Sequence, residues 1–155
     1  MANVKAIPDN YPRVSPYLSV DGAAAAIDFY TEVLGAKQRG ERMEMPGGKI
    51  CHAELQLGDS LIMLADAPPD AGLADPKTMQ MPLTVSVYVE DVDDTFARAM
   101  KHGATELRPP TNQFYGDRSA TFQDPFGFIW NVQTHIEDVS PEEMGKRMAA
   151  MMESG

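Results

Sequence analysis

The chain has 155 residues, a length typical of one compact domain. A single cysteine, Cys51, excludes an internal disulfide, and no run of about 18 apolar residues is present to span a bilayer. The formal net charge of −10 repels phosphate backbones and argues against a nucleic-acid partner. The first residues lack the apolar core of a secretion signal, so we expect a cytoplasmic protein.

The first half of the chain predicts a strand, a helix and three further strands. Residues 14–20 alternate apolar and polar side chains, as a half-buried strand does. Asp21 is a predicted N-cap, and apolar residues then recur at helical spacing until Gly35 ends the helix. The three strands that follow are predicted over residues 39–45, 49–57 and 60–65.

The second half repeats this order after a proline-rich connection over residues 67–82. A strand comes first, and then a helix that Gly103 closes. The strands of this half are predicted over residues 83–89, 105–115, 118–123 and 128–134. The copies are offset by about 68 residues, which predicts a duplicated unit. We therefore expect a single domain over residues 1–155, with module one at about 13–66 and module two at about 83–135.

Two local motifs mark the end of the second module and the C-terminus. Asp124-Pro125-Phe126-Gly127 has the residues of a tight turn before the last strand. Ser140-Pro141-Glu142-Glu143 is a capping box for a terminal helix over about residues 140–152. A methionine stripe follows along this helix, at Met144, Met148, Met151 and Met152. We expect the stripe to pack on the chain's own sheet or on a second subunit.

These features resemble the glyoxalase/bleomycin-resistance/dioxygenase superfamily, which has the vicinal oxygen chelate fold. The paired units, the Ala-Ile-Asp-Phe-Tyr-Thr-Glu-Val-Leu-Gly helix at 26–35 and the turn at 124–127 carry the resemblance. Four segments resemble its PhnB-like branch, namely Ser15-Pro16-Tyr17, Cys51-His52-Ala53-Glu54, Tyr115-Gly116-Asp117-Arg118 and residues 134–143. The resemblance implies an α+β fold in which two βαβββ modules form a curled mixed sheet, with helices on the convex face and a ligand in the concave cup. It also implies a homodimer, with strands or the terminal helix exchanged between chains.

Strand alternation selects the residues expected to face the cup. In module one these are Ser15, Tyr17, Ser19, His52, Glu54, Gln56, Leu61 and Met63. In module two they are Thr84, Ser86, Tyr88, either Arg118 or Ser119 with Thr121, and then Ile129, Asn131 and Gln133. Trp130 and Cys51 fall on the opposite faces and are expected to be buried beneath the helices.

The resemblance also implies where a metal would lie. In metal-dependent members, four strand positions supply His and Glu ligands, and strand register carries these positions onto Ser15, Met63, Thr84 and Asn131. A thioether, two hydroxyls and an amide are poor ligands for Zn²⁺, Ni²⁺ or Fe²⁺ in competition with water. We therefore expect neither a metal nor another cofactor.

His52 and Glu54 form a pair of ionisable side chains that could act on a ligand. They lie two residues apart on a strand, hence on one face, with Cα atoms about 6.6 Å apart. Such a pair can move a proton or orient a ligand. It can also supply part of a displaced metal site that Asp117 or His135 completes. In the third alternative, His52 makes hydrogen bonds within the cup and Glu54 pairs with Arg118.

Two function hypotheses follow, and whether the chain is an enzyme stays open between them. The first is a metal-free protein that binds a small aromatic or cationic molecule, as the bleomycin-resistance branch does. Its predicted ligand-binding residues are Tyr17, His52, Glu54, Met63, Tyr88, Tyr115, Arg118 and Asn131. The second is a metal-dependent enzyme, either a glyoxalase-type isomerase or lyase or an extradiol dioxygenase.

Overall fold

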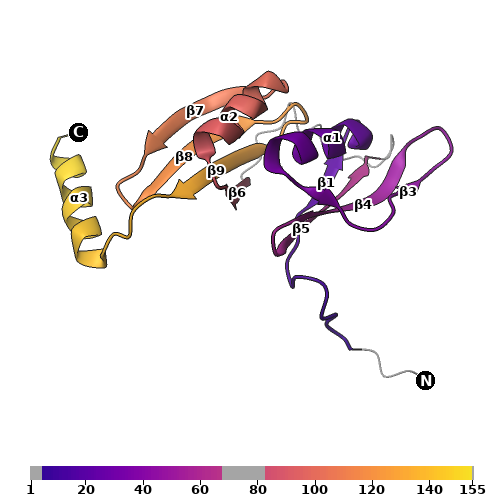
Figure 1. Cartoon of the computed structure of the whole chain (residues 1–155), viewed down its shortest axis with the longest axis horizontal. Coiled ribbons are helices and arrows are strands. Elements are labelled where there is room, and N and C mark those ends of the chain that lie inside the picture. The colour runs from indigo at the N-terminus through magenta and orange to yellow at the C-terminus, as the bar shows by residue number, and fades with distance from the viewer. Residues whose placement is uncertain (1–4, 68–82, 155) are drawn as a thin grey trace. The chain divides into compact units, whose positions relative to one another are not determined.

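A computed structural model describes residues 5–67 and 83–154 of the chain (Figure 1). The described residues form three helices and nine strands. The chain divides into two compact units, Met1–Asp75 and Pro76–Gly155, each with its own sheet. Apart from Ala67, the predicted connection over residues 67–82 lies outside the described residues. None of the described helices is long and apolar enough to cross a membrane.

Unit 1 consists of one helix on one face of a mixed sheet (Figure 1). Its elements are β1 (Tyr17–Val20), α1 (Ala23–Leu34), β2 (Lys37–Gln38), β3 (Met43–Glu44), β4 (Ile50–Leu57) and β5 (Ser60–Asp66). The strand order is β1-β5-β4-β2, and β3 also pairs with β4. β1 runs parallel to β5, and the other pairs are antiparallel.

Unit 2 repeats this connectivity. Its elements are β6 (Thr84–Tyr88), α2 (Val92–Lys101), β7 (Thr105–Asn112), β8 (Asp117–Gln123) and β9 (Ile129–His135), followed by α3 (Pro141–Glu153). The strand order is β6-β9-β8-β7, with β6 parallel to β9 and the rest antiparallel. The α+β fold of two βαβββ modules and a terminal helix is therefore confirmed.

The core of each unit lies between its helix and one face of its sheet. In unit 1 the buried side chains alternate along the strands and meet the apolar face of α1. They include Leu18, Val20, Ala26, Ile27, Tyr30, Val33, Ala53, Leu55, Ile62 and Leu64. In unit 2, Trp130 is fully buried on the helix-covered face, as predicted. Burying each large apolar side chain contributes about 1.5–3 kcal/mol to folding. The burial of these side chains therefore determines which face of each sheet packs against its helix.

The start of α1 differs from the prediction. Asp21 is exposed, and the N-cap is Gly22, with φ of 97° and no side-chain capping bond. The Asp66 carboxylate, at the end of β5, instead accepts hydrogen bonds from the backbone N–H groups of Gly22 (3.0 Å) and Ala23 (2.9 Å). Its other oxygen accepts from Ile50 N–H at 2.8 Å. A carboxylate distant in sequence therefore stabilises the helix N-terminus.

Cys51 was predicted to be buried beneath the helix, and this is wrong because β4 contains a bulge. Met43 pairs with His52, and the next residue, Glu44, pairs with Ile50, so Cys51 is an extra residue in the ladder. The bulge reverses the alternation before it. Ile50 is therefore buried while Cys51 is exposed. Of the strand predicted over 39–45, only the short strand β3 is present, and β2 lies before the predicted start.

The turn before β9 is organised by Asp124, which is buried. One carboxylate oxygen accepts hydrogen bonds from the N–H groups of Phe126 and Phe128, each at 2.9 Å. The other accepts from the indole N–H of Trp130 at 2.8 Å. Gly127, at φ of 101°, closes the turn. The predicted turn at 124–127 is therefore present, and its aspartate also fixes the largest core side chain of the unit.

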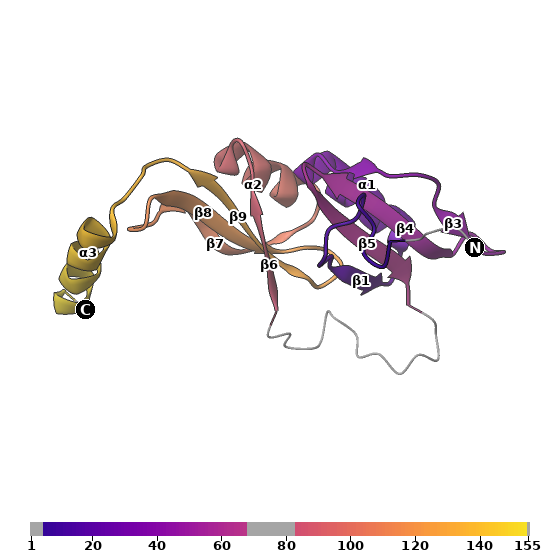
Figure 2. The same cartoon turned by 90° about the horizontal axis from the view of Figure 1, so that it is seen from below.

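The terminal helix α3 begins at the predicted cap, where Ser140 Oγ accepts from Glu143 N–H at 3.2 Å. It stands away from the sheet of unit 2 in both views (Figures 1 and 2). No residue of α3 is buried, and among the described residues it packs against no other helix or strand. The methionine stripe is therefore not packed on the unit's own sheet.

Candidate functional site

The face of the unit 1 sheet opposite α1 carries four of the predicted site residues. Tyr17 lies opposite Met63 in the ladder of β1 and β5, and Glu54 lies opposite Met63 in the ladder of β4 and β5. His52 is two residues from Glu54 on β4 and shares its face. We call this group, together with Tyr11, the polar face of unit 1.

Hydrogen bonds join the polar face into one chain. Tyr17 Oη lies 2.9 Å from His52 Nδ1, and His52 Nε2 lies 3.0 Å from Glu54 Oε2. Tyr11 Oη donates to Glu54 Oε1 at 2.9 Å and to Oε2 at 3.2 Å. The predicted His–carboxylate pair is therefore formed, with a phenol at each end.

Solvent exposure decreases along this hydrogen-bonded series from Tyr17 to Glu54. Tyr17 is 51% exposed, the His52 side chain 32% and the Glu54 side chain 14%. The hydrogen bond from His52 holds the pKa of Glu54 below its ordinary value, and the bond from Tyr11 adds to this, although burial opposes both. Glu54 is therefore an anion at neutral pH, and it is less exposed than the phenol of Tyr17.

Sequence reasoning missed Tyr11 and Arg39. Tyr11 lies in the segment before β1 and is separated from Glu54 by 43 positions. The Arg39 guanidinium stacks on the Tyr11 ring, 4.3 Å from its centroid. The hydrogen bond to Glu54 raises the pKa of Tyr11. Neither residue belongs to a motif or a periodic pattern, so the sequence held no signal for this contact.

The corresponding face of unit 2 is also polar. Ser86 lies opposite Asn131, and Asn131 lies opposite Thr121. Thr121 Oγ1 donates to Asn131 Oδ1 at 3.3 Å, and Asn131 donates to Gln133 Oε1 at 3.2 Å. The predicted residues Tyr88 and Asn131 are therefore on one face, bonded to neighbours of their own unit.

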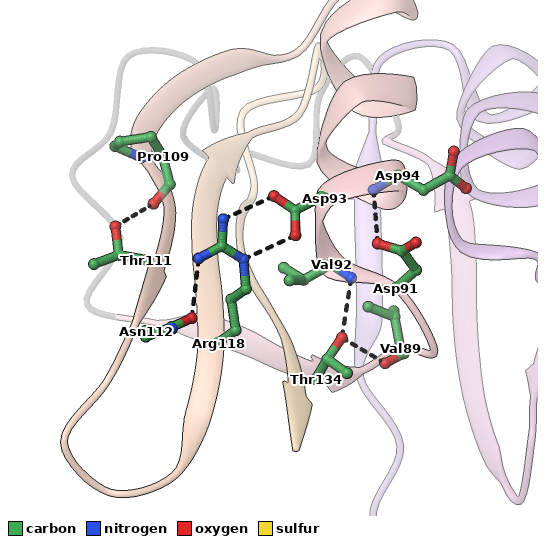
Figure 3. A network of polar contacts seen from close by, with 10 residues as sticks. All are labelled: Val89, Asp91, Val92, Asp93, Asp94, Pro109, Thr111, Asn112, Arg118 and Thr134. Carbon is green, nitrogen blue, oxygen red and sulfur yellow. Dashed lines mark hydrogen bonds and ion pairs between the residues drawn. The ribbon is translucent and has the colours of Figure 1, made fainter. Parts of the chain in front are cut away.

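Arg118 lies on the opposite, helix-covered face of β8, because it shares its alternation with the buried Ala120 and Phe122. Its guanidinium forms a bidentate ion pair with Asp93 of α2, at 2.8 and 2.9 Å, and donates to Asn112 of β7 at 2.9 Å (Figure 3). The Asp93 hydrogen bond raises the pKa of Arg118. Of the two residues predicted as alternatives, Ser119 therefore faces away from α2, on the open face of the sheet.

A second polar cluster closes the end of the unit 2 sheet. Asp117 is 5% exposed and accepts from Tyr88 Oη at 2.9 Å and from His135 Nδ1 at 2.8 Å. His135 Nε2 lies 2.8 Å from Asp138. The bonds to Asp138 and Asp117 raise the pKa of His135. Tyr115 lies nearby in sequence and stacks edge-on against Phe114.

A family model described as "Glyoxalase/Bleomycin resistance protein/Dioxygenase superfamily" matches residues 13–132. The chain belongs to this superfamily. The match covers both βαβββ units and therefore agrees with the duplicated topology.

Members of the superfamily with similar sequences or folds are known. An uncharacterized protein from Mycobacterium bovis is 37% identical over 145 residues, covering 90% of this chain and 93% of that protein. The structure of TioX from Micromonospora sp. ML1 has a TM-score of 0.61 at 22% identity and covers 83% of this chain and 100% of its own. A PhnB protein from Bacillus cereus has a TM-score of 0.61 at 18% identity, with 79% and 99% covered. At these identities, the solved structures bear on the fold alone.

The residues at the superfamily's metal positions do not fit a divalent ion. The ladders place Tyr17, and not Ser15, opposite Met63, and they place Ser86, and not Thr84, opposite Asn131. Each of these side chains offers a hydroxyl, a thioether or an amide rather than an imidazole or a carboxylate. Throughout residues 5–67 and 83–154, no three His, Cys, Asp or Glu side chains are grouped so that they could hold a metal ion.

Proposed function

We propose that this superfamily member binds a small molecule without a metal, and that the polar face of unit 1 is the main ligand surface. The observation that carries the proposal is the hydrogen-bonded series Tyr17–His52–Glu54–Tyr11. Each polar group in it already has a partner, so the face is ordered before a ligand arrives. The uncharged side chains at the metal positions support the metal-free reading.

The chemistry of the polar face favours a planar ligand with a positive charge or several hydrogen-bond donors. Glu54 supplies a negative charge, and Tyr11 and Tyr17 supply aromatic rings. The Met63 thioether lies between β1 and β4, where a sulfur atom can contact an aromatic ring. A cation over a phenol ring contributes about 0.5–2 kcal/mol to the binding free energy, depending on how far the contact is shielded from water.

Three further residues of unit 2 belong to the proposal. Tyr88 and Asn131 lie on the open face of their own sheet, and the Tyr115 ring stacks edge-on against Phe114. We propose that these residues contact a ligand within unit 2 itself. Arg118 is left out of this set, because its guanidinium is bound to Asp93 on the other face.

Binding is tested by titrating a planar cation, 9-aminoacridine, and a neutral planar analogue, acridone, into the protein by calorimetry. We expect the cation to bind and Glu54→Gln to weaken it about tenfold, which corresponds to about 1.4 kcal/mol. Glu44→Gln is the matched control, because Glu44 is an exposed carboxylate on β3 and its loss should leave the affinity unchanged. Equal affinity for both Gln variants would contradict the role of Glu54.

The alternative is a metal-dependent enzyme, which the fold and the His52–Glu54 pair favour. Metal analysis of protein purified without chelators separates the two functions. About one tightly held transition-metal ion per chain would reverse the proposal, whereas trace amounts support it.

A further inference from the structure

Two exposed tyrosines, one in each unit, donate hydrogen bonds to acceptors of different kinds. Tyr17 is 51% exposed and its Oη lies 2.9 Å from an imidazole nitrogen, Nδ1 of His52. Tyr88 is 64% exposed and donates to a carboxylate oxygen of Asp117, also at 2.9 Å. The two phenols are therefore matched in exposure and hydrogen-bond length but not in the base beside them.

The base decides whether the phenol can lose its proton. An imidazole accepts a proton near neutral pH, whereas an ionised carboxyl group is a far weaker base. A carboxylate beside a phenol stabilises the protonated phenol, and the hydrogen bond to Asp117 accordingly raises the pKa of Tyr88. Only Tyr17 has a partner that can take its proton as it reacts.

Glu54 fixes which nitrogen of His52 is free to act. An ionised carboxylate has no proton to donate, so the 3.0 Å contact with Glu54 requires a proton on Nε2 of His52. In the neutral imidazole, Nδ1 is then the acceptor, and Tyr17 must donate to it. The order phenol, imidazole, carboxylate is that of an activated nucleophile, its base and the group that orients the base.

We propose that Tyr17 is a nucleophile for acyl transfer from small activated esters, with His52 as its base and Glu54 as the positioning residue. The proposal goes beyond ligand binding, because a covalent bond forms on Tyr17. It uses the polar face of unit 1 but does not require the cationic ligand proposed above.

The reaction balances with water as the only co-reactant. Tyr17 Oη attacks the carbonyl carbon, its proton passes to His52 Nδ1, and the bond to the leaving alkoxide or phenoxide breaks. The leaving group takes the proton back from His52, or leaves as a phenoxide while His52 releases the proton to solvent. Water then attacks the acyl-tyrosine, and neutral His52 accepts a proton from that water. His52 returns this proton to Tyr17 Oη as the acyl–oxygen bond breaks, which leaves the carboxylic acid and the free phenol. An aryl ester hydrolyses readily because phenoxide leaves more easily than an alkoxide.

The test uses the full chain with Cys51→Ser, because the exposed thiol of Cys51 would also be acylated. The probe is p-nitrophenyl acetate, with release of p-nitrophenolate followed by absorbance and acetylated peptides followed by mass spectrometry. We expect Tyr17 to be acetylated about 100-fold faster than Tyr88 in the same molecule, the usual range for a positioned general base. Tyr17→Phe should abolish the initial burst.

His52→Gln and Glu54→Gln separate chemistry from folding. We expect His52→Gln to slow acetylation of Tyr17 about 100-fold, because the general base is lost. Glu54→Gln should slow it less, and Glu44→Gln should leave it unchanged. Urea unfolding of each variant reports whether it is folded.

Two outcomes would overturn the proposal: acetylation of Tyr17 no faster than that of Tyr88 in the folded Cys51→Ser protein, or a burst that survives Tyr17→Phe. Calorimetry with 9-aminoacridine on the same protein is independent of both. Binding without acetylation would therefore overturn only the acyl-transfer proposal, and acetylation without binding would overturn only the cationic-ligand proposal.

Discussion

Single aspartates hold the backbone of each unit at the points where its elements meet. Asp66 accepts from the amides of Gly22, Ala23 and Ile50, joining β5 to the start of α1 and to β4. Asp124 accepts from two amides of its own turn and from the Trp130 indole. Burial raises the pKa of Asp66, but the three backbone N–H groups outweigh it and leave the value below normal. Asp66 therefore acts as a charged acceptor in the folded state, and Asp124 accepts hydrogen bonds at both of its carboxylate oxygens.

Asp124→Asn tests this role in unit 2. The amide keeps the shape of the side chain but replaces one acceptor oxygen with a donor, which then faces either the turn amides or the indole N–H. Hydrogen bonds to a buried charged group contribute about 1.5–3 kcal/mol, so we expect a loss of about 2–3 kcal/mol in the free energy of unfolding, measured in urea. Asp59→Asn, in the exposed turn between β4 and β5, is the control and should change it little.

His135 should make stability depend on pH. Both of its ring nitrogens face carboxylates, so the imidazolium can donate to Asp117 and Asp138 together, while the neutral ring can donate to only one of them. The raised pKa means that the folded state binds this proton more tightly than the unfolded state. The stabilisation is therefore complete below the ordinary histidine value of 6.5 and is lost as pH rises through the higher folded value.

Urea unfolding at pH 5.5 and pH 8.5 measures this contribution. We expect the wild-type protein to lose more stability between the two pH values than His135→Gln does, since glutamine cannot gain the proton. The same loss in both proteins would show that His135 does not hold the end of the sheet.

The placements of Cys51 and Arg118 depend on partners that the local sequence does not reveal. A bulge turns Cys51 outward, and nothing in the local sequence signals the extra residue. Arg118 follows the alternation of Ala120 and Phe122, but its charge made either face plausible until Asp93 on α2 was known as its partner. Burial patterns of apolar residues were predictable, and polar partners far apart in sequence were not.

At the scale of elements, Gly116 and α3 both contact the segment around Glu137. Gly116 has φ of 100°, and its carbonyl accepts from the amides of Ile136 and Glu137. A Cβ at this position would overlap the carbonyl oxygen of Glu137. Arg147 of α3 donates to Glu137 at 2.7 and 3.0 Å and to the Phe114 carbonyl at 3.1 Å. The residues at the start of β8 therefore stabilise, through these hydrogen bonds, the segment that leads into α3.

Gly116→Ala should loosen this arrangement. The side chain requires both a strained backbone and displacement of residue 137, so we expect a loss of about 2 kcal/mol or more in urea unfolding. Gly145→Ala is the matched control, because Gly145 lies in α3 with no atom within 4 Å of an added Cβ. That change should favour the helix by about 0.5–1 kcal/mol. Similar effects from both substitutions would contradict the close approach at Gly116.

Most elements were predictable because their signals are local. The apolar stripes of α1 and α2, the cap at Ser140 and the alternation of β1 and β6 each lie within one short stretch of sequence. The His52–Glu54 pair was predictable for the same reason. Tyr11 was not, because it comes from a segment without periodicity. The capping of α1 by Asp66 was not predictable either, because Asp21 is nearer in sequence and matches the residue preference of an N-cap.

At the scale of the whole molecule, the methionine stripe of α3 is exposed, although Arg147 of the same helix contacts Glu137 and Phe114. Met148, Met151 and Met152 are 47%, 56% and 77% exposed. We propose that the chain forms a homodimer in which the methionine stripe is covered by the second subunit, because burying each such side chain gains about 1.5–3 kcal/mol.

A chain ending at Val139 tests the role of α3. We expect the full chain to elute as a dimer in gel filtration with light scattering, and the shortened chain to elute as a monomer with a lower melting temperature. If the shortened protein keeps both its size and its melting temperature, α3 makes no contact between subunits.

The prolines of β7 limit how copies of this chain can join. Pro109 and Pro110 have no N–H to offer, and the pairing of β7 with β8 shifts register on both sides of Arg108. An outer strand of this kind is a poor template for a further strand from another molecule, whereas β6, at the other edge, has no proline. The β7 edge therefore disfavours strand addition to this sheet. Because open-ended growth needs two usable edges, the prolines favour closed pairs over fibres.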